Sequence, residues 1–189
     1  MLGSMLPDFE AMIGVPLIEA RDADIRRGID LHHRTDQAFH RAPTFLASCA
    51  RALDELTGAG VRRGTARAVG HVGSEMFLDG CLTHEQGYAD DYLRALDVEI
   101  DGLLQWQDDG RAFSKLHTRL KTWGVPSDYA EPSFVLERLS DTLRRRPALA
   151  VLGDQAAQVA AFLPRLQRMV ELGAPKLLHE LKDGLGSGH

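Results

Sequence analysis

The sequence has little of what several classes of protein depend on. It holds two cysteines in 189 residues and no Cys-x-x-Cys pair. We therefore expect Cys49 and Cys81 to be small buried apolar groups in a reducing compartment. No apolar run approaches the roughly 18–20 residues that a membrane span needs, and the first residues lack the basic start and apolar stretch of a signal peptide. These absences predict a cytoplasmic protein with no membrane segment.

An excess of positive charge is also missing. The 22 basic and 27 acidic residues leave a net charge of −5 with histidine neutral, and the two signs alternate along the chain. A general nucleic-acid binder needs a basic surface, so we do not expect nucleic acid as a partner. The oligomeric state stays open.

Strand-forming residues are scarce as well. Val and Ile number 15, whereas Leu and Ala number 49, and aromatic residues make up 6%. Helices favour Leu and Ala, and strands favour β-branched residues, so the fold is predicted to be all-α. A chain of this length buries roughly 70% of its unfolded surface and needs no metal or disulfide to fold. We expect a single all-α domain over residues 1–183 and a flexible tail over 184–189.

Apolar residues recur at helical spacing in four stretches, within residues 46–56, 92–104, 135–143 and 159–170. The first follows Pro43, a favourable helix start. The last contains Pro164, which we expect to kink or divide the helix. Glycine and proline punctuate the chain between the stretches. This pattern predicts one helical bundle of about seven helices.

A line of polar residues marks a further helix, expected over residues 24–42. His32 and Asp36 are four apart and therefore share a face, and His40 lies one turn further. An imidazole and a carboxylate at this spacing can reach one divalent ion, but an exposed pair that only stabilises the helix is the commoner outcome. Arg34 lies around the helix, as either a surface charge or an anion clamp.

A second polar line runs through residues 70–80, where His71, Glu75 and Asp79 step by four. Three glycines in this segment would each cost a helix about 1 kcal/mol relative to Ala. Such a cost predicts that a neighbour or a ligand comes close. The alternative is a partly looped segment with its acids in solvent.

Asp8 follows Pro7 and precedes Phe9. An acid between large apolar residues is either the N-cap of a helix that begins near the proline or a ligand that points inward. Both interpretations stay open.

Three of these segments, in this order, resemble the acyl carrier protein phosphodiesterase family, a divergent branch of the HD-type metal-dependent phosphohydrolases. Residues 3–9, Gly-Ser-Met-Leu-Pro-Asp-Phe, are similar to the family's Gly-Asn-Leu-Leu-x-Asp-Phe. Residues 28–36, Gly-Ile-Asp-Leu-His-His-Arg-Thr-Asp, resemble its Gly-Ile-x-x-His-Arg-x-Ile-Asp, with Pro43 beyond. Residues 75–78, Glu-Met-Phe-Leu, are similar to its Asp-His-Phe-Leu, and residues 145–147 to its Arg-Arg-Pro.

The resemblance implies an HD-like fold and a hydrolase of lipid metabolism that acts in fatty acid biosynthesis. This enzyme would be a metal-dependent phosphodiesterase that cleaves the 4′-phosphopantetheine–serine phosphodiester of holo-acyl carrier protein. The implied cofactor is manganese (Mn²⁺) or Mg²⁺, and oxygen and nitrogen ligands without thiolate suit these ions better than a closed structural zinc site. The implied metal ligands are Asp8, His32, Asp36 and Glu75, and we add His71 as a further candidate ligand. The implied catalytic residues are Asp8 as general base, Asp36, and Arg34 as phosphate contact.

The sequence departs from the family in three places. Met76 stands where the family has a histidine, and His71, one turn before Glu75, is the candidate replacement. Phe39-His40 replaces a Thr-Asp pair, and the family's Asn-x-Leu-Ala-His motif has no counterpart in this sequence. Two alternatives therefore stand beside the enzyme: a phosphohydrolase of another phosphate ester, and a non-catalytic helical binding protein with a degenerate site.

Acyl carrier proteins are acidic, so a net-acidic enzyme should concentrate arginines where its substrate docks. Arg62, Arg63 and Arg67 lie near the start of the helix that carries Glu75 and are the candidate partner contacts. Residues 144–146 form a second arginine cluster. For both clusters an ordinary solvated surface is the commoner explanation.

Overall fold

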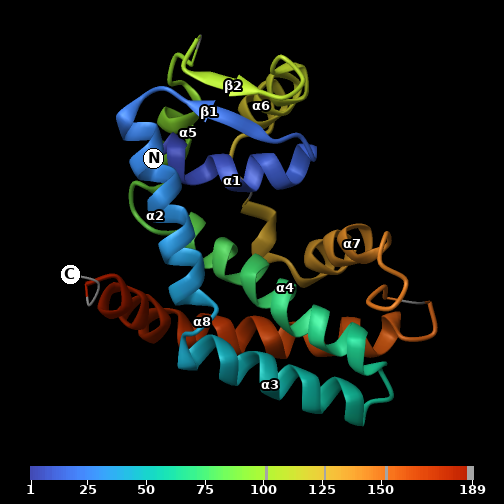
Figure 1. The fold of residues 1–189 in the computed structure, drawn as a ribbon. Helices are drawn as coiled ribbons and strands as arrows, with labels where there is room; N and C mark the ends of the chain where they lie inside the picture. The colour runs from blue at the N-terminus through green and yellow to red at the C-terminus, as the bar shows by residue number, and fades with distance from the viewer. Residues whose placement is uncertain (101, 126, 152, 187–189) are drawn as a thin grey trace. The chain divides into compact units, whose positions relative to one another are not determined.

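The structure is a computed structural model that describes residues 1–100, 102–125, 127–151 and 153–186 (Figure 1). It is 73% helical with one small sheet, which confirms the predicted all-α class. The elements, in chain order, are α1 (Leu2–Ile13), β1 (Leu17–Ala20), α2 (Ala23–Phe39), α3 (Pro43–Gly58), α4 (Arg63–Thr83), α5 (Tyr88–Leu96), β2 (Leu104–Trp106), α6 (Arg111–Trp123), the 3-10 helix η1 (Ser127–Ala130), α7 (Pro132–Leu143) and α8 (Ala156–Gly186).

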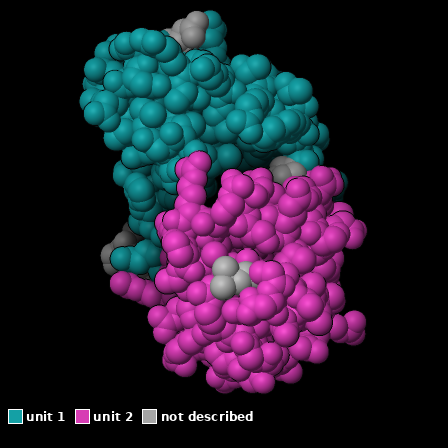
Figure 2. Space-filling view, turned by 90° about the vertical axis from the view of Figure 1, so that its right-hand side faces the viewer, with its two compact units in different colours: residues 1–37, 85–125 teal, residues 38–84, 126–189 magenta. Residues whose placement is uncertain are grey.

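The chain divides into two compact units, coloured separately in Figure 2. The first unit comprises residues 1–37 and 85–125, and the second comprises residues 38–84 and 126–189. Each unit has its own cluster of buried apolar side chains. The single domain over 1–183 stays a prediction, since two compact units can still unfold as one cooperative domain. Helix α8 ends at Gly186, inside the stretch expected to be a tail, and residues 187–189 lie outside the described residues.

In the second unit, α3, α4 and α8 lie side by side (Figure 1) and α7 packs against α4 and α8. Their shared core includes Phe77 and Phe162, each only 1% exposed. Small residues on α4 allow the close packing. A Cβ on Gly70 would lie 2.8 Å from the Cβ of Ala52, and one on Gly73 would lie 3.0 Å from Leu166 Cδ2. The glycines of α4 therefore admit neighbouring helices.

In the first unit, β1 and β2 pair antiparallel, with Leu17 opposite Trp106. Side chains from α1, α2, α5 and α6 share a core with the indole of Trp106. Helices α1 and α2 cross at two glycines, because a Cβ on Gly28 would lie 2.7 Å from the Cα of Gly3. Only residues without a side chain allow two helix backbones to approach so closely.

The helix expected across residues 92–104 is wrong beyond Leu96, where α5 ends. Ile100, Leu103 and Leu104 still pack against the core of the first unit, but from a turn and from β2. Gly102 has a φ of 73°, a left-handed conformation that a helix does not use. Apolar spacing alone did not reveal this change, because a turn followed by a short strand can present the same residues to one core.

Neither Pro7 nor Pro164 interrupts the helix that contains it. Helix α1 begins at Leu2, with Met1 as its N-cap, and contains Pro7, so the expectation that Asp8 is an N-cap is wrong. Helix α8 runs as one 31-residue helix through Pro164, which does not divide it. The segment 70–80 is helical within α4, so its partly looped alternative is also wrong.

Candidate metal centre

His71 and Glu75 form the centre of the candidate site. They lie one turn apart on α4, and His71 Nε2 is 3.2 Å from Glu75 Oε1. The two side chains are 44% and 36% exposed, so the pair is open to solvent on one side and packed on the other. The predicted helical spacing thus brings both groups together.

His40 joins this pair from the short connection between α2 and α3. Its ring stacks on the ring of His71, with centroids 4.8 Å apart and planes 14° from parallel. His40 Nε2 lies 3.9 Å from Glu75 Oε1. Among the described residues, the ligand atoms of His40, His71 and Glu75 all lie within 4.8 Å of one another and could hold a metal ion.

Aromatic side chains form the inner wall of this group. The buried ring of Phe45 packs edge-on against both imidazoles, with centroids 5.6 Å from His40 and 5.2 Å from His71. Phe39 packs against Phe45 in turn, with centroids 4.3 Å apart. This wall packs against the inner side of the two histidine rings.

Cys49 and Glu75 determine the protonation of His71. A hydrogen bond to the Cys49 sulfur, together with the hydrogen bond to the Glu75 carboxylate, raises the pKa of His71 to about 10. Burial acts in the opposite direction, because it disfavours the charged ring. At neutral pH the metal-free ring is therefore an imidazolium paired with Glu75. A metal ion must displace that proton to bind.

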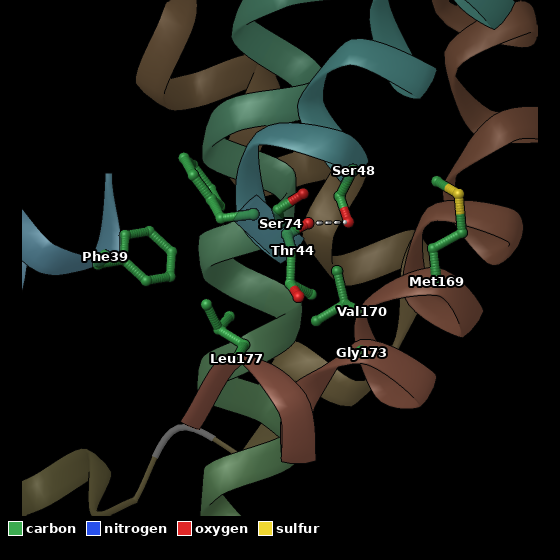
Figure 3. Close-up of a pocket in the computed structure, with 9 residues that line it drawn as sticks. Phe39, Thr44, Ser48, Ser74, Met169, Val170, Gly173 and Leu177 are labelled. Atoms are coloured by element: carbon green, nitrogen blue, oxygen red, sulfur yellow. Dashed lines mark hydrogen bonds between the residues drawn. The ribbon is translucent and has the colours of Figure 1, made fainter. Parts of the chain in front are cut away.

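A small apolar pocket lies behind the aromatic wall (Figure 3), and its lining residues are Phe39, Thr44, Phe45, Ser48, Ser74, Met169, Val170, Gly173 and Leu177. Its space is about that of a single water molecule. Its hydroxyls are used within the protein: Ser48 donates to the Thr44 carbonyl and Ser74 donates to the Gly70 carbonyl. The pocket is a packing gap rather than a substrate site.

The remaining predicted ligands belong to the first unit. There the Nδ1–H of His32 donates to the Ser4 carbonyl at 2.9 Å, and the same nitrogen is 3.9 Å from Asp8 Oδ2. The structure therefore brings Asp8 and His32 together. The Nδ1 that lies near Asp8 is, however, already hydrogen-bonded to the Ser4 carbonyl. Asp36 is exposed on α2. Arg34 borders a shallow, open depression on that helix.

The predicted site residues thus fall into two groups, one in each unit. His71 and Glu75 meet in the second unit, and Asp8 and His32 meet in the first. The enzyme hypothesis requires Asp8, His32, Asp36 and Glu75 to converge on one cation, and that convergence stays a prediction. The sequence-based ligand set left out His40, although His40 stands where the resembled family has the aspartate of its Thr-Asp pair. Its place one turn beyond Asp36 on the same polar line was the signal that could have identified it.

The predicted partner contacts differ in their surroundings. The guanidinium of Arg62 donates to the carbonyls of Pro147 and Ala150, at 3.3 and 2.8 Å, and so clasps the chain after α7 to the start of α4. Arg63 and Arg67 are exposed. A role of these arginines in docking a partner stays a prediction.

Comparison with known proteins adds no relative: no family model, curated protein or solved structure matches the chain. Among the described residues, no helix is both long enough and apolar enough to cross a membrane. Functional inference therefore depends on the geometry of the His40–His71–Glu75 group and on the sequence motifs.

Proposed function

We propose that this chain binds a divalent metal ion through His40, His71 and Glu75 and is a phosphodiesterase that acts on holo-acyl carrier protein. The observation that supports the metal site is the convergence of two imidazoles and one carboxylate within 4.8 Å. The choice of reaction and substrate depends on the motif resemblance of residues 3–9 and 28–36.

The ligand set favours some ions over others. Mg²⁺ prefers an octahedron of oxygen ligands and keeps most of its waters, whereas this group offers two nitrogens and one oxygen. Imidazole suits transition metals and carboxylate suits Mn²⁺, so we propose Mn²⁺ rather than Mg²⁺ as the cofactor. Two histidines and a glutamate also match a catalytic zinc site, which makes Zn²⁺ the competitor to test.

The charges of the group suit an anionic substrate. A bound divalent ion would supply a Lewis acid that stabilises charge on the phosphoryl oxygens. The single Glu75 carboxylate neutralises only half of the ion's charge, so the site keeps a net positive charge that attracts a phosphodiester. In the reaction, the oxygen of water bonds to phosphorus and the bond from phosphorus to the serine oxygen breaks. The serine oxygen takes a proton, and 4′-phosphopantetheine leaves.

The proposal is tested first by metal content. The chain, freed of metal by a chelator and then dialysed against Mn²⁺, Zn²⁺ or Mg²⁺, should retain about one ion per chain, measured by elemental mass spectrometry. His71→Gln and Glu75→Gln should each abolish retention. His84→Gln is the matched control, because His84 is exposed just beyond the end of α4, outside the group.

The second test is turnover. Intact-protein mass spectrometry should show holo-acyl carrier protein losing its phosphopantetheine arm with the metal-loaded chain and not with Glu75→Gln. Hydrolysis of generic phosphodiesters without action on the carrier protein would contradict the proposed substrate and support the proposed phosphodiesterase reaction. Metal retention without hydrolysis of any of these substrates would contradict the proposed enzymatic activity and leave only the metal site.

A second candidate, a non-catalytic binding protein, is favoured by the high pKa of His71. A protonated His71 paired with Glu75 satisfies both groups without any metal ion. This candidate predicts no stoichiometric metal in the dialysed sample, and it predicts that His71→Gln lowers the thermal stability of the chain without changing its metal content.

A further inference from the structure

The candidate metal centre has a cysteine, Cys49, beside one of its histidines. Cys49 lies on α3, and its thiol donates a weak hydrogen bond to the Gly70 carbonyl, with 3.7 Å between sulfur and oxygen. Phe45, one turn before Cys49 on the same face of α3, packs edge-on against the His71 ring, with centroids 5.2 Å apart. A hydrogen bond with the Cys49 sulfur is also the largest cause that raises the pKa of His71. Cys49 therefore bridges the backbone of α4 and the imidazole of the next residue along that helix.

The close approach of α3 and α4 is what allows this contact. A Cβ on Gly70 would lie 2.8 Å from the Cβ of Ala52 and 3.4 Å from the Cys49 carbonyl oxygen. Any residue larger than glycine would push the two helices apart at the level of Cys49. Gly70 thus determines that the thiol reaches His71.

One ring nitrogen of His71 faces the carboxylate of Glu75. Nε2 lies 3.2 Å from Glu75 Oε1 and belongs to the group that could hold a metal ion. Cys49 is not a member of that group among the described residues. The sulfur is therefore a neighbour of one ligand rather than a further ligand.

We infer that Cys49 is a positioning residue, which accepts the Nδ1–H of His71 and so keeps Nε2 directed at the cation position beside Glu75 and His40. This inference rests on the metal-binding role proposed above. Histidines that bind metals almost always donate their second ring N–H to a neighbouring acceptor, which fixes the orientation of the ring. Here that acceptor is a thiol.

A thiol acceptor makes metal retention depend on the chemical state of one cysteine. Alkylation of the Cys49 sulfur adds bulk between α3 and His71 and displaces the ring. Cys81 is the natural control, because it is the other cysteine, is equally half-buried, and lies ten residues beyond His71 on the same helix.

The first test compares Mn²⁺ affinity, measured by isothermal titration calorimetry, in the full chain and in three variants. Cys49→Ala should weaken binding about 10–100-fold, the usual effect of losing such an acceptor. Cys49→Ser supplies a hydroxyl acceptor in the same place and should recover most of that loss. Cys81→Ala should bind as the full chain does. Equal affinity of Cys49→Ala and the full chain would overturn the inference.

The second test needs no metal and separates this inference from the proposed function. In the metal-free chain labelled with ¹⁵N-histidine, Cys49→Ala should shift the ring resonances of His71, Cys49→Ser should partly restore them, and Cys81→Ala should leave them in place. If the full chain binds no metal, the proposed function is contradicted. The contact between Cys49 and His71 is then tested by these spectra alone. Unchanged His71 resonances in Cys49→Ala would then overturn the inference as well.

Discussion

The two units hold their histidine–carboxylate pairs in different ways. In the first, His32 is bonded to a backbone carbonyl and its partner Asp8 is 69% exposed. In the second, His71 is held by Glu75, by the stacked ring of His40 and by the edge of Phe45. A largely exposed carboxylate loses its side-chain conformational entropy when it binds a ligand. A group fixed by packing has already lost that freedom, which makes the second unit the better candidate for a metal site.

The largest expected effect is on the stability of the two cores, which a core substitution in one unit should affect unequally. Phe162, on α8, is 1% exposed in the core of the second unit. Replacing it with alanine leaves a cavity and should destabilise that unit by about 3–5 kcal/mol. In differential scanning calorimetry, independent units should give two transitions, of which Phe162→Ala lowers only one. One transition that shifts as a whole would support the predicted single domain instead.

The glycine crossing of the first unit can be broken selectively. A Cβ on Gly3 would lie 2.2 Å from the Ile25 carbonyl oxygen, so the backbone must move to admit it. Gly3→Ala should destabilise the chain by about 1–3 kcal/mol in urea unfolding. The matched control is Gly58→Ala in α3, where a Cβ meets nothing within 4 Å. It should stabilise by up to about 1 kcal/mol, and a loss of stability there would contradict the packing argument.

The start of α2 in the first unit depends on a neighbour in sequence. The Asp22 carboxylate accepts hydrogen bonds from the backbone N–H groups of Asp24 and Ile25, at 2.8 and 2.9 Å. Asp22→Ala should cost about 1 kcal/mol, as for other helix caps. Asp22→Asn retains an acceptor and should keep most of the stability. Equal losses for both variants, measured by thermal unfolding, would show that the cap geometry is not the cause.

The start of α3 in the second unit depends instead on a residue far along the chain. Glu180, on α8, accepts hydrogen bonds from the backbone N–H of Thr44 at 3.0 Å and from its hydroxyl at 2.8 Å. Desolvation raises the pKa of Glu180, but these two hydrogen bonds, with Lys176 nearby, outweigh it and hold the pKa below its ordinary value of 4.5. The carboxylate therefore stabilises the fold at neutral pH.

Glu180→Gln keeps one oxygen acceptor, so its effect should be the smallest of these. Because the folded pKa is lowered, the stabilisation is present in full above the ordinary carboxyl value and is lost as the pH falls through the folded value. Thermal unfolding should show the variant below the full chain at neutral pH, and the two should converge in acid. Glu171→Gln, at an exposed site on α8, is the control. A difference that persists unchanged in acid would assign the effect to packing.

The sequence anticipated those features that depend on near neighbours. The Leu- and Ala-rich composition predicted the helical class, and Pro43 marked the first residue of α3. The spacing of His71 and Glu75 predicted a pair on one helix face. The glycines of residues 70–80 predicted that a neighbour or a ligand approaches α4 closely, and the neighbours are Ala52 and Leu166. The end of α5 at Leu96 was missed because apolar residues reach the same core from a turn and a strand.

The sequence by itself determined the helices and which residues share a helix face, because both follow from backbone hydrogen bonds and side-chain spacing over a few residues. Only the tertiary structure decided that His40 stacks on His71, that Cys49 reaches the same ring, and that Glu180 bonds to Thr44, 136 residues before it, at the start of α3. These contacts join segments distant in the chain. Their geometry depends on which helices meet and how closely they pack. The glycines of α4 indicated a close approach, but no local pattern of residues identified the helix that makes it.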